Sequence, residues 1–425
     1  MAKLLTKSKY LAGLQCPKLL WTQVNDKDSI PEVNEAQQKI FDVGTQIGIL
    51  ATKLFPEGIK VSEDSFTENL NQSKELLKEN KPLFEAGFMI NNLFSRADIL
   101  VPNGDSWDIV EVKSSTEVKD VNIHDVSFQK HVYELSGLKI NKCYLMYVNN
   151  QYVKNGEIEP EKLFNKEDIT EQVIEFSEGI QERINEMLDI INGNMPQTSI
   201  SKNCSDPYEC ALKDICWKEI PQNSVFDLTR GGKKSWNLFE DGIIHIKDIP
   251  ENFKLSDKQQ LQKECELLND CYINKSAIKS FIDTLQYPIY YFDFETINPC
   301  VPLYDGMSPY KKIAFQYSLH IQEEPNGKLK HISFLADHKE DPREAILKSM
   351  KENLGEHGTI LAWNESFEKG VIKELVEYFP EFADWGSSII SRFNDLIIPF
   401  RNFSYYNPVQ RGSSSIKKVL PALTD

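Results

Sequence analysis

The sequence predicts an α/β protein made of two α/β units, and three observations support that prediction. In the first half, apolar runs typical of strands lie between segments whose apolar residues recur at helical spacing. From Tyr287 onward, three strand-like segments are followed by a helix, a strand and a helix. A polar, helix-rich stretch separates the two halves. This order indicates two mixed sheets, each packed against helices.

The composition is that of an ordinary globular protein, with 425 residues, 40% hydrophobic and 26% charged. The formal net charge of −16 gives no overall attraction to phosphate backbones, so a nucleic-acid partner would need local basic patches or metal ions. The N-terminus lacks the apolar core of a signal peptide, and no apolar window reaches the length of a membrane span. Eight cysteines without secretion signals fit a reducing compartment. We therefore expect a cytoplasmic protein that does not interact with membranes.

Helical spacing of apolar residues predicts the helices of the first half. Pro56 and Gly58 end the second of these segments, and Gly137 ends the fourth. The helices are expected at 6–21, 34–54, 66–79, 121–137 and 167–193. A continuous apolar run at 142–148 predicts a buried strand.

Residues 96–113 predict a β-hairpin. The runs Ala97–Val101 and Trp107–Val112 flank Asn103-Gly104, which is typical of a type I′ turn. Such a turn would place Asp98 opposite Ile109, on the same face as Glu111 and Lys113, with Val110 and Val112 on the other face. Two carboxylates and an amine on one face can bind a divalent cation and orient a water molecule. The alternative is the solvated face of an amphipathic hairpin.

The second half begins with a polar region at 219–286, expected to be a linker or a small helical subdomain with helix at 256–285. Strands are then expected at 288–296, 313–321 and 330–337, followed by helix 343–355, strand 358–364 and helix 366–379. The domains are therefore expected at 1–218, 219–286 and 287–425.

Gln129 and Tyr133 lie one helical turn apart on the helix after the hairpin. Together with Asp98, Glu111 and Lys113 they form the ordered pattern Asp, Glu-x-Lys, Gln-x-x-x-Tyr. This set resembles the PD-(D/E)XK nuclease superfamily, in the branch of RecB-type nuclease domains, and implies a restriction-endonuclease-like fold for residues 1–218.

The resemblance implies a role for each of these residues. Asp98 and Glu111 would bind Mg²⁺ or Mn²⁺, Lys113 would serve the attacking water, and the pair Gln129 and Tyr133 would contact DNA. The backbone carbonyl of Val112 would be a further metal ligand. Related domains often carry a histidine on the early helix, and the corresponding segment at 44–51 has none. The metal site would then have one ligand fewer.

Three cysteines lie close together in a polar segment that ends at Trp217. Their spacing is not that of a zinc knuckle, and a fourth thiolate would be needed for an all-cysteine site. The early Cys16 is the best candidate. Cys16 with Cys204, Cys210 and Cys216 resembles the iron–sulfur nucleases of the AddB and CRISPR-associated exonuclease type. The resemblance implies a structural [4Fe–4S] cluster, and four thiolates would also suit Zn²⁺. The remaining cysteines are expected to be buried packing residues: Cys143, Cys265, Cys271 and Cys300.

A second acidic set lies in the C-terminal region. Asp293 and Glu295 share a strand face, Asn364 is followed by Glu368, and Asp395 comes later. The pattern resembles the DEDD exonucleases of the ribonuclease H-like superfamily. The resemblance implies a ribonuclease H-like domain at 287–425, in which Asp293 and Glu295 bind metal. The last acid of that family lies beyond the second motif, and the sequence ends before such a segment. The domain is therefore expected to be truncated or to lack its final ligand.

Together these patterns predict a metal-dependent nuclease that hydrolyses phosphodiester bonds of DNA, acting at single-stranded ends. DNA is the expected partner in preference to RNA. The chain as a whole resembles bacterial proteins with a RecB-like nuclease half and a C-terminal domain of unknown function. Two alternatives remain open. One is a catalytically silent nucleic-acid-binding module of a repair or defence complex, and the other is a ribonuclease driven by the C-terminal domain.

Overall fold

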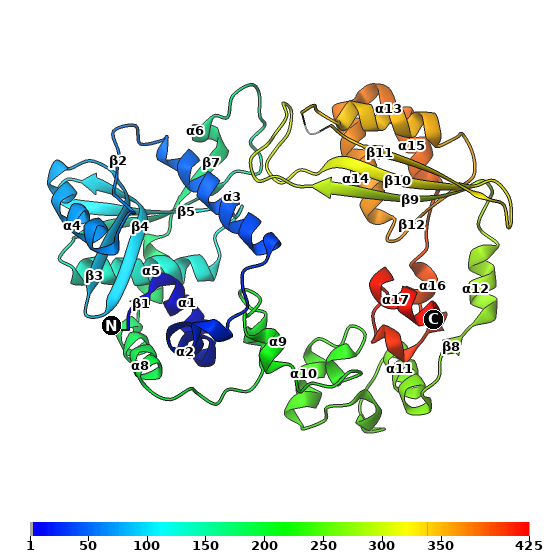
Figure 1. The fold of residues 1–425 in the computed structure, drawn as a ribbon, viewed down its shortest axis with the longest axis horizontal. Coiled ribbons are helices and arrows are strands. Elements are labelled where there is room, and N and C mark those ends of the chain that lie inside the picture. Colours follow the sequence, from blue (N-terminus) through cyan, green and yellow to red (C-terminus); the bar gives the residue numbers. More distant parts are fainter. Residues whose placement is uncertain (1–2, 338, 425) are drawn as a thin grey trace. The chain divides into compact units, whose positions relative to one another are not determined.

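The computed structural model describes residues 3–337 and 339–424. The chain is a mixed α/β protein that divides into two compact units (Figure 1). Unit 1 comprises Met1–Trp217 and Pro299–Tyr310, and unit 2 comprises Lys218–Asn298 and Lys311–Asp425. Within the described residues, no helix is long and apolar enough to cross a membrane.

Seven strands form the sheet of unit 1 in the described part of the chain. The strand order is β2-β3-β4-β5-β6-β7, and β1 pairs with β4. The pairs β1–β4, β2–β3 and β5–β6 are parallel and the others are antiparallel, so the sheet is mixed. The strands are β1 Leu5–Thr6, β2 Ile59–Lys60, β3 Leu83–Ile90, β4 Leu93–Asn103, β5 Ser106–Lys113, β6 Ile140–Val148 and β7 Phe164–Asp168.

Helices cover both faces of this sheet. On one face α5 packs with α1 and α7 in a core that includes Tyr10, Ile109 and Phe128. On the other face α3 contributes Ile47 to a core with Val110 (Figure 1). The helices are α1 Lys7–Gln15, α2 Pro17–Asn25, α3 Glu35–Thr52, α4 Phe66–Leu76, α5 Asp120–Leu135, α6 Pro160–Leu163, α7 Thr170–Phe176, α8 Ile180–Asn192 and α9 Lys213–Cys216.

The hairpin of β4 and β5 turns one residue later than expected. Asn103 pairs with Ser106, so the two-residue loop is Gly104-Asp105 and the expected pairing of Asp98 with Ile109 is wrong. A type I′ turn needs positive φ at both central residues. Here Gly104 has φ +59 at the first central position, whereas Asn103 and Asp105 do not have positive φ. Ile109 pairs with Leu100 instead, and the face assignment of the side chains is unchanged because the register moves by two.

Two expected helices are interrupted. The helix expected at 6–21 is broken at Cys16, which has extended backbone angles, and Pro17 starts α2 at the position where its missing N–H is tolerated. The helix expected at 167–193 begins as strand β7 and continues as α7 and α8, with Gly179 in the left-handed region between them.

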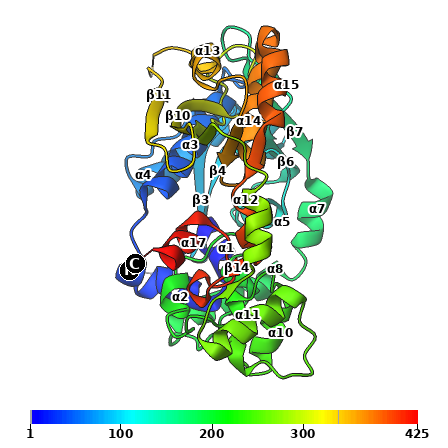
Figure 2. The ribbon, with the colours of Figure 1, turned by 90° about the vertical axis from the view of Figure 1, so that its right-hand side faces the viewer.

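The sheet of unit 2 has the order β11-β10-β9-β12-β13. Strands β9, β10 and β11 are antiparallel neighbours, while β12 and β13 run parallel to β9. Helix α13 contacts β10 and β11, and α14 packs against α15 (Figures 1 and 2). The elements are β9 Ile289–Ile297, β10 Ile313–Gln322, β11 Leu329–Leu335, α13 Arg343–Asn353, β12 Thr359–Ala362, α14 Ser366–Tyr378, α15 Ala383–Ser391, β13 Phe393–Asp395, α16 Ile398–Arg401 and α17 Ile416–Leu423.

The polar region expected at 219–286 is part of unit 2 rather than a separate body. Its α11 contacts the 3-10 turn Pro408–Gln410, and β8 pairs with β14 from the end of the chain. The expected helix at 256–285 is divided by β8. The elements are α10 Lys233–Glu240, α11 Asp257–Leu268, β8 Tyr272–Ile273, α12 Lys275–Ile282 and β14 Tyr405–Tyr406.

Candidate functional site

Asp98 and Glu111 lie next to each other on strands β4 and β5. The register that pairs Ile99 with Val110 continues to bring Asp98 opposite Glu111. The backbone N–H of Val112 donates a hydrogen bond to Asp98 Oδ2 at 2.8 Å. Glu111 is only 1% exposed, so it does not belong to a solvated hairpin face. Both faces of β5 are buried, and Glu111 lies on the face that helix α5 covers.

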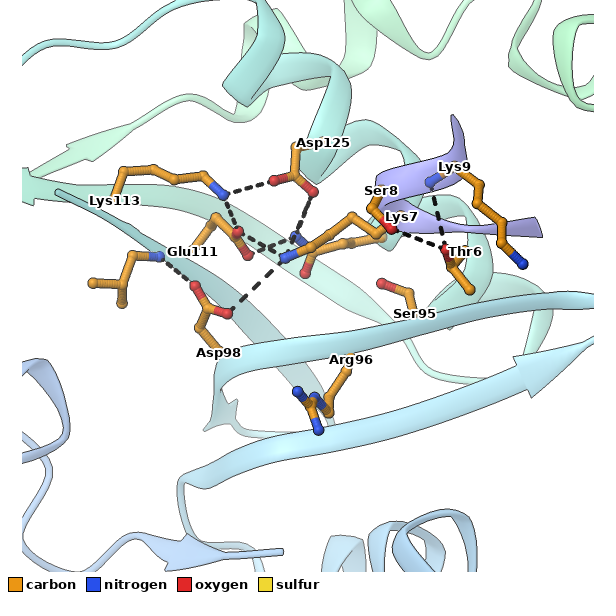
Figure 3. Close-up of polar contacts among 12 residues, drawn as sticks. Thr6, Lys7, Ser8, Lys9, Ser95, Arg96, Asp98, Glu111, Lys113 and Asp125 are labelled. Carbon is orange, nitrogen blue, oxygen red and sulfur yellow. Dashed lines mark hydrogen bonds and ion pairs between the residues drawn. The ribbon is translucent and has the colours of Figure 1, made fainter. Parts of the chain in front are cut away.

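Lys113 links this strand to helix α5. Its Nζ atom lies 2.5 Å from Glu111 Oε1 and 2.7 Å from Asp125 Oδ2 (Figure 3). Asp125 is 2% exposed. A lysine shared by two buried carboxylates is held in one place by charge-assisted hydrogen bonds. Asp125 is therefore a third carboxylate of the same cluster.

Gln129 and Tyr133 lie behind Glu111 rather than at the surface. Gln129 Nε2 donates to Glu111 Oε2 at 2.6 Å and to Asp125 Oδ1 at 3.2 Å. The hydroxyl of Tyr133 donates to Gln129 Oε1 at 3.2 Å, and it also lies 3.3 Å from Ser95 Oγ. Both side chains have no exposed surface. In this conformation they orient the carboxylate of Glu111 and do not face a surface ligand.

Lys7, the first residue of α1, reaches into the same cluster. Its Nζ atom lies 2.8 Å from Glu111 Oε1, 3.7 Å from Asp125 Oδ1 and 4.0 Å from Asp98 Oδ1 (Figure 3). Its side chain is 25% exposed. Here we call Asp98, Glu111, Asp125, Lys7 and Lys113 the carboxylate cluster.

Burial and mutual charge shift the pKa values within the carboxylate cluster. Burial and the neighbouring Glu111 raise the pKa of Asp98 to about 7, and the same two causes raise the pKa of Asp125. Burial alone would raise the pKa of Glu111, but Lys113 and Lys7 outweigh it and lower that pKa. For both lysines burial lowers the pKa, but the carboxylates outweigh it and raise the pKa. Near neutral pH the cluster thus contains two ammonium groups and a charged Glu111.

Lys7 and Asp125 were not predicted from the sequence as site residues. Asp125 lies one helical turn before Gln129 on α5, so helical spacing could have found it. Several helices and strands, from α2 to β3, separate Lys7 from the hairpin in the sequence, and no local pattern connects the two. Only the pairing of β1 with β4 brings the start of α1 to the cluster.

The four cysteines of the expected cluster line one small cavity in unit 1. Cys16 lies between α1 and α2, and Cys210 packs with Ala12 and Leu19 of these helices. Burial is the main cause of the raised pKa of Cys210, and the nearby thiols add to it. The cavity is lined by Cys16, Lys18, Thr198, Ser199, Ile200, Cys204, Cys210, Leu212, Lys213 and Cys216.

Of the cysteines expected to be packing residues, Cys143, Cys265 and Cys300 are buried and Cys271 is partly exposed. Burial raises the pKa of Cys143 to about 12 and that of Cys265 to about 11, in keeping with unreactive thiols.

The second acidic set lies in unit 2, around the adjacent strands β9, β12 and β13. Asp293 and Glu295 are exposed on β9, whereas Glu368 and Asp395 are buried. Asp395 Oδ1 accepts the backbone N–H of Asn364 at 2.9 Å. Burial raises the pKa of Glu368 to about 7, and the negative charges of Asp293 and Asp395 add to the shift. These carboxylates are therefore within electrostatic reach of one another.

The donor atoms have the chemistry expected of the two metal sites. Carboxylate oxygens at Asp98 and Glu111 suit Mg²⁺ or Mn²⁺, and four thiols suit an iron–sulfur cluster or Zn²⁺. In the described part of the chain, however, no group of three or more histidine, cysteine, aspartate or glutamate side chains is already arranged to bind a metal ion. In the carboxylate cluster, lysine amines contact the oxygens that a cation would use.

Comparisons with known proteins give similarities without a named activity. Residues 290–415 match the family described as Domain of unknown function (DUF2779). The chain is 23% identical over 487 residues to a protein named Uncharacterized protein UU173 from Ureaplasma parvum serovar 3, covering 84% of this chain and 70% of that protein. A solved structure titled Crystal structure of SSO0001 is 12% identical, covers 51% of this chain and 87% of its own, and has a TM-score of 0.23. A TM-score this low supports no conclusion about the fold.

Proposed function

We propose that unit 1 is a metal-dependent nuclease of the PD-(D/E)XK type, which hydrolyses phosphodiester bonds of DNA from single-stranded ends. One observation carries the proposal: Asp98, Glu111 and Lys113 form one compact cluster on one face of the hairpin of β4 and β5. The mixed sheet, with parallel β5 and β6 flanked by antiparallel strands and α5 against it, supports a restriction-endonuclease-like fold.

Each residue of the cluster has a defined part in such a reaction. A divalent cation, Mg²⁺ or Mn²⁺, would supply Lewis-acid stabilisation of the phosphate and a more acidic water. Asp98, Glu111 and the carbonyl of Val112 would bind the cation. The raised pKa of Lys113 keeps its ammonium protonated, so it acts as a donor to the attacking water or to a phosphate oxygen and not as a base. Gln129 and Tyr133 hold Glu111 in position.

We further propose that Cys16, Cys204, Cys210 and Cys216 hold a structural [4Fe–4S] cluster. The supporting observation is that the thiol of Cys16 and those of the three cysteines at 204–216 line one cavity. An iron–sulfur protein purified without oxygen should be brown and absorb at about 400 nm. A colourless protein that contains zinc would show that the site is a four-thiolate zinc site instead.

A second candidate function lies in unit 2. Its strand order, with three antiparallel strands followed by two parallel ones, supports a ribonuclease H-like fold. The proximity of Asp293, Glu368 and Asp395 supports an acidic site there. If this site were the active one, the protein would be a ribonuclease. If neither site were active, the protein would bind nucleic acid without cleaving it.

Digestion of end-labelled single-stranded DNA and RNA with Mg²⁺ or Mn²⁺ separates these functions. Lys113→Ala should reduce DNA cleavage by roughly a hundredfold or more, as expected for loss of a group that stabilises the transition state. Asp293→Ala should leave that cleavage unchanged. Full cleavage in Lys113→Ala would overturn the proposal, and RNA cleavage lost in Asp293→Ala would favour the second candidate. No cleavage under any of these conditions would favour the silent module.

A further inference from the structure

The oxygens of Asp98 and Glu111 are not equally available. Asp98 Oδ2 accepts the backbone N–H of Val112, and Glu111 Oε2 accepts from Gln129. The remaining oxygens, Asp98 Oδ1 and Glu111 Oε1, both face Lys7. Lys113 also contacts Glu111 Oε1, at 2.5 Å, whereas Lys7 is the amine that lies within 4.0 Å of both free oxygens. A cation that bound Asp98 and Glu111 through these two oxygens would meet the amine of Lys7.

Lys7 also supplies a positive charge beside the buried carboxylates of Glu111 and Asp125. Glu111 and Asp125 are almost fully buried, and a buried carboxylate without a counter-charge is costly. Lys113 compensates part of that charge from the β5 side and Lys7 compensates part from the α1 side. The cluster thus contains three acidic side chains and two ammonium groups. A divalent cation on the same oxygens would supply the positive charge that Lys7 now supplies. It would also repel the ammonium group of Lys7.

We propose that Lys7 is a built-in counter-ion that competes with the divalent cation for Asp98 and Glu111, so that metal binding displaces its side chain. This rests on the proposed function of unit 1. Lys7 can leave without unfolding α1, because it is the first residue of the helix and its side chain is already 25% exposed. Lys7 is a positioning residue in this scheme, because it acts on the metal site and not on the substrate.

Isothermal titration of the full chain with Mn²⁺ tests this competition. Lys7→Met keeps the length of the side chain and removes its charge, so Mn²⁺ should bind roughly ten- to a hundredfold more tightly than to the wild type. Lys9→Met is the matched control, because it removes the same charge from the same helix turn. The Lys9 amine donates to the carbonyl of Leu4, and its loss should change the affinity by no more than about twofold.

The outcomes separate the two proposals. Equal or weaker Mn²⁺ binding in Lys7→Met, with binding lost in Glu111→Gln, would overturn the competition and leave the nuclease proposal standing. Binding that Glu111→Gln does not alter would place the metal elsewhere and overturn both. Binding in Lys7→Met but not in the wild type would support the competition.

A measurement on the wild type covers the case in which Lys7→Met does not fold. Acetylation of Lys7, followed by mass spectrometry, reports how freely its amine is exposed. Saturating Mn²⁺ should speed this modification several-fold, because the displaced side chain leaves its carboxylate partners, while acetylation of Lys9 serves as the internal reference. An unchanged Lys7 rate in the presence of bound Mn²⁺ would contradict displacement.

Discussion

Lys7 is the first residue of helix α1, and Cys16 is the extended residue that caps the same helix at its C-terminus. One end of α1 therefore lies in the carboxylate cluster and the other at the cysteine cavity. Gln15, at the last turn, donates to the carbonyls of Asn203 and Tyr208 at 2.8 and 2.6 Å. An α-helix of nine residues is roughly 13 Å long, so the two sites lie about one helix length apart.

Replacing Cys16 by serine should remove the proposed cluster and destabilise unit 1. The absorbance at about 400 nm should disappear. The free energy of unfolding should fall by several kcal/mol, on the order expected when a structural metal centre is lost. Absorption spectra after anaerobic purification and thermal unfolding followed by circular dichroism would measure both effects.

Cys271→Ser is the control for this prediction, because Cys271 is a partly exposed cysteine that does not line the cavity. It should keep both the colour and the stability of the wild type. If Cys16→Ser kept both as well, Cys16 would not be a ligand.

Gln129 should matter more for stability than Tyr133. Gln129→Leu leaves the buried Glu111 Oε2 without its donor, which should cost roughly 2–3 kcal/mol because the lost bond is made to a charged group. Tyr133→Phe removes a bond between neutral groups and should cost about 1 kcal/mol. Urea unfolding of both variants measures the difference. Equal losses of stability in the two variants would show that the hydrogen bond from Gln129 to the charged Glu111 contributes no more than the bond between Tyr133 and Gln129.

Glu368 should make unit 2 less stable as the pH rises. Its Oε2 atom is buried without a hydrogen-bond partner among the described residues, and burial raises its pKa from 4.5 to about 7. A carboxyl whose pKa is higher in the folded state binds its proton more tightly there. Its contribution to stability is therefore complete below pH 4.5 and is lost as the pH rises through about 7.

Glu368→Gln removes this titration, so it should exceed the wild type in stability above about pH 7 by on the order of 2–3 kcal/mol. The difference in free energy of unfolding between Glu368→Gln and the wild type should become smaller as the pH falls from about 7 toward 4.5. Urea midpoints of unit 2 across this range measure it. Glu381→Gln, which removes an exposed carboxylate from the same unit, controls for net charge. A difference independent of pH would contradict the raised pKa.

Two glycines of unit 2 should respond to alanine in opposite directions. Gly358 has φ +93, and a Cβ atom there would lie 2.1 Å from the carbonyl oxygen of Pro288. Gly358→Ala should therefore lower the free energy of unfolding by at least about 2 kcal/mol. Gly370 lies in α14 with nothing within 4 Å of the added atom, so Gly370→Ala should raise that free energy by up to about 1 kcal/mol. Denaturant unfolding of both variants tests the pair.

The sequence predicted the local elements near the first site well. Alternation of apolar residues in β4 and β5 places Asp98, Glu111 and Lys113 on one face whatever the exact turn, because a register change of two preserves the face. Helical spacing relates Gln129 to Tyr133 in the same way. The exact turn depended on which residue has positive φ, and Gly104 took the first central position because it has no Cβ.

In unit 2, the spacing of apolar residues predicted β9, β10, β11 and β12 and the helices α13 and α14. It did not show that 219–286 packs with the C-terminal region, or that Pro299–Tyr310 belongs to unit 1. The division into units depends on contacts between residues far apart in the chain, and local sequence propensities do not predict such contacts.

The sequence by itself determined which side chains share a strand face or a helix face, because those periods are properties of the backbone. Only the tertiary structure decided that Lys7 joins Asp98, Glu111 and Asp125, that Gln129 and Tyr133 are buried, and that Cys16 lines the cavity with the later cysteines. The place of Lys7 depends on the pairing of β1 with β4 and on the packing of α1 against α5. The place of Cys16 depends on the contacts of Gln15 with Asn203 and Tyr208. Burial and charge pairing, which determine the pKa values and the proposed metal competition, follow from that packing.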